Sequence, residues 1–157
     1  MDVRFAPQYD EVVVAQVLGV PRTTVRRWRR QVLVPRTDGL WSFLDLAEGF
    51  VLASFRHATG RPCRACTPSA AVRKRLNPVQ WAPDGYITRF PVAHTDERVV
   101  MDARLCAGHP PCVRTGAPVT AVLPLLRAGL PIDRVGAKSG WGRDDVESAV
   151  LYMEGLS

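Results

Sequence analysis

The chain has 157 residues, of which 46% are hydrophobic and 23% are charged, and its net charge is +6. This composition is typical of a folded protein with one ordinary domain or two small ones, and it excludes a disordered tail. No apolar run approaches the roughly 20 residues that span a bilayer, and residues 1–11 lack the apolar core of a signal peptide, so a cytoplasmic location without a membrane partner is expected.

The positive charge is confined to the first half of the chain. Residues 1–77 carry 13 Arg and Lys against 6 Asp and Glu, a net charge of +7, whereas residues 78–157 carry 8 against 9, a net charge of −1. Excess positive charge favours a polyanionic partner. The charge therefore predicts two domains, residues 1–77 for a polyanion and residues 78–157 for a different partner.

Helix signals begin at Asp10, which is a predicted N-cap for a helix that ends before Gly19. Pro21 suits the first turn of a second helix that continues to about Arg30. The segments VLVP and LWSF, separated by the turn TDG, suit a short β-hairpin wing. Ser42, with an acidic residue three positions later, resembles a capping box and predicts a helix to about residue 57.

Residues 11–30 fit the helix-turn-helix pattern. The position at which the two helices touch holds the small Ala15, and the position that needs a left-handed backbone holds Gly19. Val25 and Trp28 lie three residues apart and are predicted to face inward, which leaves the arginines outside. The alternative is a basic helix that simply stays solvated.

This pattern predicts that the second helix docks in the major groove of double-stranded DNA. Predicted contacts to base edges are Arg22, Thr23, Thr24 and Arg27, and predicted contacts to phosphates are Arg26, Arg29, Arg30 and Arg36 of the wing.

Residues 9–57, with the wing followed by WSFLDLAEGFVLASFR, resemble the DNA-binding domain of the MerR-like regulators. Those regulators usually continue into a long dimerising coiled coil, which the sequence RPCRACTPSAA at residues 61–71 cannot form. A homodimer is expected, since one helix-turn-helix rarely holds its site tightly, but it must be built in another way.

The remaining chain predicts short elements. SAAVRKRL at residues 69–76 suits a basic helix, and Asp84-Gly85 suits the turn of a small hairpin. Three further helices are predicted at residues 119–128, 132–138 and 144–154. The expected fold is mainly α: a winged helix-turn-helix and a small three-helix, helix-turn-helix-like domain, joined by a short β-hairpin region.

The second half resembles the domain of unknown function 433 family. The matching features are Val99-Val100 with Asp102 and Arg104, Gly108 with Pro110, Thr115 with Pro118-Val119, Leu125 to Gly129, and Asp145 to Ala149. Members that follow a MerR-like domain look like VapB-type antitoxins, which are encoded beside PIN-domain ribonuclease toxins and repress their own operon. The resemblance implies an autoregulatory antitoxin of a type II toxin–antitoxin system.

The residues themselves favour a protein partner for the second half. Its last predicted helix begins with the sequence RDDVES, and the carboxylates of Asp144, Asp145 and Glu147 would be repelled by phosphates. The region also holds more apolar side chains than a three-helix unit can bury. The predicted partner-binding residues are Trp141, Val146, Val150 and Tyr152.

Four cysteines raise the question of zinc. Cys63 and Cys66 have the spacing of half a zinc site, and the other half would come from Cys106, His109 and Cys112. The five-residue gap between the last two cysteines is unusual for such a site, so buried free thiols are predicted, with no metal and no other cofactor.

No enzyme signature is present: the sequence has no glycine-rich phosphate loop and no nucleophile elbow. Two alternatives to the antitoxin stay open. One is a stand-alone MerR-like transcription regulator whose second half binds a small effector or zinc, and the other is an enzyme of nucleic-acid metabolism that uses the basic half to hold its substrate.

Overall fold

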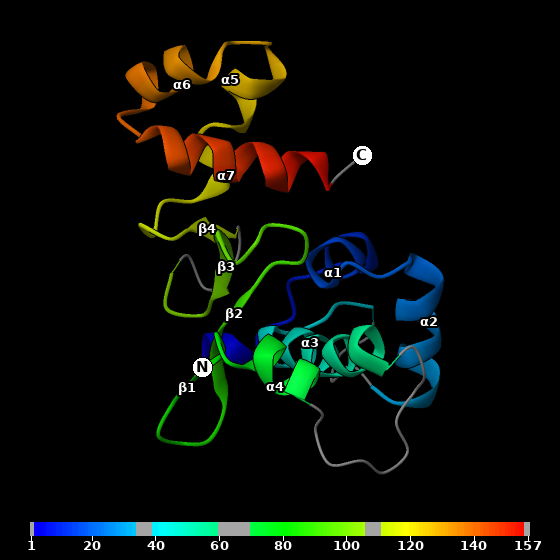
Figure 1. The fold of residues 1–157 in the computed structure, drawn as a ribbon. Helices are drawn as coiled ribbons and strands as arrows, with labels where there is room; N and C mark the ends of the chain where they lie inside the picture. Colours follow the sequence, from blue (N-terminus) through cyan, green and yellow to red (C-terminus); the bar gives the residue numbers. More distant parts are fainter. Residues whose placement is uncertain (1, 34–38, 60–69, 106–110, 156–157) are drawn as a thin grey trace. The chain divides into compact units, whose positions relative to one another are not determined.

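The computed structural model describes residues 2–33, 39–59, 70–105 and 111–155 (Figure 1). These residues form seven α-helices, short 3-10 helices and a four-stranded antiparallel sheet whose strands occupy the middle of the chain. The chain divides into two compact units, Met1–Phe90 (unit 1) and Pro91–Ser157 (unit 2). Among the described residues, no helix has the length and hydropathy that a bilayer span requires.

Unit 1 is mostly helical, as expected. Its elements are η1 (Val3–Phe5), α1 (Glu11–Leu18), α2 (Arg22–Gln31), α3 (Phe43–Thr59), α4 (Ala70–Leu76), β1 (Gln80–Trp81) and β2 (Ile87–Pro91), the last of which crosses the boundary between the units.

The predicted helix boundaries in unit 1 are confirmed by their caps. The Asp10 carboxylate accepts hydrogen bonds from the backbone N–H groups of Val12 and Val13 at 2.8 and 2.9 Å, and Gly19 is left-handed with φ of 62°. At the start of α3, the Asp45 carboxylate accepts from the Ser42 backbone at 2.8 Å, and the Ser42 hydroxyl accepts from the Asp45 backbone at 3.2 Å. Helices α1 and α3 therefore begin where a side chain satisfies one or two of their first N–H groups, whereas α2 begins after Pro21 without a side-chain cap.

The predicted wing lies partly outside the described residues, because residues 34–38 are not among them. In the part that is described, Trp41 forms an antiparallel bridge with Tyr9, whose backbone N–H donates to the Trp41 carbonyl at 3.0 Å. Both side chains are fully buried. Trp41 therefore connects the start of α3 to the segment before α1.

The aromatic core of unit 1 extends to the hairpin formed by β1 and β2. The Phe90 ring of β2 lies 5.4 Å from the ring of Phe43 and 5.1 Å from that of Phe50, both on α3. The hairpin thus packs in unit 1, and the boundary lies at Phe90, later than the change of charge at Asn77 that suggested domains 1–77 and 78–157.

Unit 2 contains strands that the sequence did not predict. Its elements are β3 (Val99–Asp102), β4 (Cys112–Val113), η3 (Val119–Ala121), α5 (Leu123–Arg127), α6 (Ile132–Ser139) and α7 (Arg143–Glu154). The single helix predicted at 119–128 is interrupted at Val122, since Pro124 occupies the first turn of α5. Helix α7, red in Figure 1, packs against α5, α6, β3 and β4.

The turn between α6 and α7 repeats the turn between α1 and α2. In both places an eight-residue helix ends at a left-handed glycine, Gly19 or Gly140, and two residues separate that glycine from the next helix. A small residue lies at the helix crossing in each case, Ala15 in unit 1 and Gly136 in unit 2. A Cβ on Gly136 would lie 3.0 Å from the Trp141 carbonyl oxygen, so the crossing in unit 2 accommodates only a very small residue.

Gly140→Ala is expected to destabilise unit 2 by about 1 kcal/mol, because an alanine in the left-handed region costs roughly that amount. Gly140 has φ of 73°, whereas the nearby Gly142 has φ of −65° and open space around its Cα. Gly142→Ala is the control for backbone conformation: it adds no left-handed strain, and its poorer N-cap for α7 is offset by a less flexible unfolded chain, so it should cost less than Gly140→Ala. Urea denaturation of both variants checks the pair, and equal losses would contradict the role of the left-handed turn.

Candidate DNA-binding interface

The residues of helix α2 form one buried face and one exposed face. Val25 is fully buried and Trp28 is 8% exposed, as the spacing predicted. The predicted contact residues on the outside are Arg22, Thr23, Arg26, Arg27 and Arg30, which are exposed, and Arg29, which is half-buried. Arg36 lies outside the described residues. The outer face of α2 therefore presents a dense array of guanidinium groups.

Thr24 is a correction to the predicted set of base contacts. Its side chain is buried, and its hydroxyl accepts a hydrogen bond of 2.8 Å from the Arg56 guanidinium on α3. Thr24 lies four residues before Trp28, and residues with this spacing share one face of a helix. It therefore belongs to the inward face and ties α2 to α3, a contact that sequence reasoning missed.

Glu11, at the first position of α1, is a second residue that sequence reasoning missed. Its carboxylate accepts from Arg26 Nε at 2.9 Å and lies 3.5 Å from Arg29 NH1. The hydrogen bond from Arg26 holds the pKa of Glu11 below its usual value. Arg22, Arg27 and Arg30 form no salt bridge with the described part of the chain, so their charges are available to an external anion.

The predicted partner-binding residues of unit 2 are only partly accessible. Val146 is fully buried and Tyr152 is 8% exposed, so neither offers a contact surface. The prediction assumed a bare three-helix unit, but β3 and β4 also pack on α7 and cover its apolar side. Trp141 and Val150 are half-buried and remain the accessible pair of the four.

The outer face of α7 is acidic where that of α2 is basic. Arg143 pairs with Asp133 at 3.0 Å and with Glu147 at 2.9 Å, while Asp144 is exposed at the first turn. Counted from the left-handed glycines, Glu147 occupies the position of Arg26, and the buried Val146 occupies that of Val25. The two turns therefore share an inner face and differ in charge on the outer one.

The cysteines are mostly outside the described residues. Cys63, Cys66, Cys106 and His109 lie in segments 60–69 and 106–110, while Cys112 is buried on β4. Within the described ranges, no three His, Cys, Asp or Glu side chains group as metal ligands would. The prediction that the chain holds no zinc stays a prediction.

Comparison with known proteins identifies the fold. No protein-family model and no curated protein matches the sequence. The chain is similar to the crystal structure of Rv2018 from Mycobacterium tuberculosis, with a TM-score of 0.73 over 92% of this chain and 97% of that one, at 20% sequence identity. Similarity at this level of identity shows a common fold.

Glu11→Gln is expected to tighten DNA binding by about threefold to fivefold, the equivalent of losing one exposed ion pair. The substitution frees Arg26 and Arg29 for phosphates and removes a negative charge beside them. A fluorescence-anisotropy titration with a DNA duplex checks this result, and Glu48→Gln, which removes a carboxylate from α3, is the matched control. If Glu11→Gln binds DNA more weakly, Glu11 does not compete with phosphates for Arg26 and Arg29. It would then orient these arginines for contact with DNA.

Proposed function

We propose that the protein is the antitoxin of a type II toxin–antitoxin system. Unit 1 binds operator DNA through α2 and represses the operon, and unit 2 binds and neutralises a PIN-type ribonuclease toxin. The chain itself carries out no catalysis in this proposal.

The observation that carries the DNA-binding part is the pairing of a helix-turn-helix backbone with an arginine-covered outer face. An α-helix fits the major groove of B-DNA, where side chains near its start reach base edges and flanking cations hold phosphates. Arg22, Thr23 and Arg27 are exposed near the start of α2, and Arg26, Arg29 and Arg30 flank them. This arrangement supports base contacts by the first group and phosphate contacts by the second.

The charge of unit 2 supports a protein partner. Asp133, Asp144 and Glu147 lie on or beside the outer face of α7, where a second DNA helix would otherwise approach. Carboxylates at this position oppose phosphates. The resemblance of the second half to antitoxins encoded beside PIN-domain ribonucleases makes such a toxin the proposed partner, and the half-buried Trp141 and Val150 are its proposed contacts.

The proposal also includes a homodimer. Helix-turn-helix proteins commonly bind two half-sites about one helical turn of DNA apart, with one protomer on each. The operator is therefore expected to be an inverted repeat.

The test is co-expression of the full chain with the PIN-type ribonuclease of a neighbouring reading frame. The full chain should restore growth and co-purify with the ribonuclease. Full chain carrying Arg22→Ala and Arg27→Ala should still restore growth while the shared promoter becomes derepressed. Failure of the native chain to bind or inhibit the ribonuclease would overturn the antitoxin part, whereas an unchanged promoter would overturn the DNA-binding part.

A further inference from the structure

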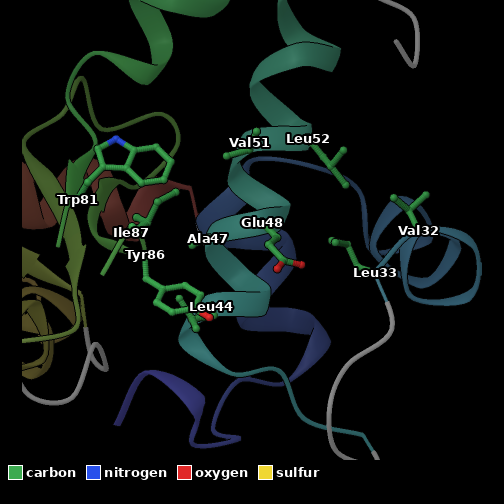
Figure 2. Close-up of a pocket in the computed structure, with 11 residues that line it drawn as sticks. Val32, Leu33, Leu44, Ala47, Glu48, Val51, Leu52, Trp81, Tyr86 and Ile87 are labelled. Atoms are coloured by element: carbon green, nitrogen blue, oxygen red, sulfur yellow. The ribbon is translucent and has the colours of Figure 1, made fainter. Parts of the chain in front are cut away.

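An apolar groove crosses unit 1 beside α3 (Figure 2). Its floor is formed by α3, one wall by the two residues that follow α2, and the other wall by the hairpin of β1 and β2. Its volume is about 380 Å³, which lies within the roughly 300–1,000 Å³ range of small-molecule sites. The residues that decide its chemistry are Leu33, Glu48, Val51, Trp81 and Tyr86.

The hairpin wall supplies two accessible aromatic rings. Trp81 is 59% exposed and Tyr86 is 42% exposed. The Tyr86 ring packs edge-on against Phe5, and the Arg4 guanidinium lies 5.5 Å from its centre. Because Arg4 already lies over the Tyr86 ring, Trp81 is the ring of this wall that offers a face for stacking and for attraction of a cation.

Two of the described residues that line the groove have ionisable side chains: Glu48, with its carboxylate, and Tyr86, with its phenol. Figure 2 shows the Glu48 carboxylate extending from α3 toward Leu33. It forms no salt bridge with the described part of the chain. An apolar ligand that covers the groove would remove water from this carboxylate, which is costly unless the ligand brings a positive charge.

The positive charge beside the hairpin wall is paired. Arg4 is bound by two carboxylates, Asp2 and Asp84, each at 2.6 Å. Although unit 1 is basic in total, the described residues that line the groove include one acidic side chain, Glu48, and no basic one, so the lining itself complements a cation.

We infer that this groove binds a small apolar organic cation, with its rings or alkyl groups between α3 and Trp81 and its charge near Glu48. An anion of the same size would be repelled by Glu48, and a neutral ligand would leave that carboxylate dehydrated and unpaired. This site is separate from the DNA-binding and toxin-binding roles proposed above.

The test is calorimetric titration of the full chain with tetraphenylphosphonium, without DNA or toxin. One ion should bind per chain. Glu48→Gln should weaken binding about fivefold or more, since it removes the opposing charge and keeps the shape. Trp81→Ala should weaken it about tenfold through lost ring contact. Glu11→Gln is the matched control, because it makes the same change of net charge elsewhere in unit 1 and should have no effect.

Three results would overturn the inference. The first is no binding to the native chain, and the second is an equal effect of Glu48→Gln and Glu11→Gln. The third is a native dimer, measured by light scattering, that Trp81→Ala converts to a monomer, because a second copy would then occupy the groove. Glu48 and Trp81 are exposed, so both variants should fold, and circular dichroism verifies this before titration.

Discussion

Arg22→Ala combined with Arg27→Ala is expected to weaken binding to the promoter fragment upstream of the protein's own gene by a factor of about 30 or more. Both side chains are exposed near the start of α2, and neither forms a salt bridge in the described part of the chain. Each specific base contact is worth about 1–3 kcal/mol, so the loss of two amounts to a factor of roughly 30 or more. On a random duplex, the double variant should show a shallower salt dependence, by about two units of slope if both arginines also neutralise phosphates.

The matched control for this variant is Arg127→Ala combined with Arg134→Ala in unit 2. Both residues are exposed, and their removal lowers the net charge by the same amount. Promoter affinity measured by gel shift should stay close to that of the native chain. If the control variant loses as much affinity as the α2 variant, binding depends on total charge, and the assignment of α2 as the recognition helix is wrong.

Trp41→Ala is expected to destabilise unit 1 by about 3–5 kcal/mol, the cost of truncating a fully buried aromatic side chain. Trp41 is fully buried, and its backbone bridges to Tyr9. Because the Trp41 Nε1 atom has no hydrogen-bond partner in the described part of the structure, Trp41→Phe removes no hydrogen bond there and should cost much less. Urea denaturation followed by circular dichroism measures these differences without relying on tryptophan fluorescence.

Trp81→Ala is the control for Trp41→Ala, since it makes the same chemical change at a side chain that is 59% exposed. Its cost should be below about 1 kcal/mol, as surface substitutions usually are. A large loss at Trp81 together with a small one at Trp41 would contradict the described core of unit 1.

The helices of unit 1 and the turn at Gly19 could be predicted because their signals are local. Asp10 and Ser42 cap helices within three residues of themselves, and Gly19 meets a backbone requirement that few other residues satisfy. The burial of Thr24 could also have been predicted, because its four-residue spacing from Trp28 places it on the buried face of α2. Its polar side chain had suggested an exposed position instead. The Arg56 contact joins residues 32 positions apart, which no local pattern reveals.

The strands of unit 2 were missed for a physical reason. All four residues of β3, Val99–Asp102, are buried, so the strand lacks the alternation of polar and apolar residues that marks a half-exposed strand. Strand β4 has two residues, too few for any pattern. Because these strands cover α7, the surplus of apolar side chains that suggested Val146 and Tyr152 as contacts is taken up inside the unit.

The boundary between the units shows that charge and packing divide the chain differently. Charge changes sign near Asn77 because it reflects the solvent-facing residues of each segment. Packing changes at Phe90 because that ring completes the core around Phe43 and Phe50.

The repeated turn at Gly19 and Gly140 shows that the outer charge of this motif is independent of its folding. The frame is maintained by the left-handed glycine, the small residue at the crossing and the inward valine, Val25 or Val146, which is fully buried. The outward positions contribute little to stability and can change sign, as Arg26 and Glu147 do. Surface substitutions can therefore reverse the charge on the outer face of this frame at little cost in stability.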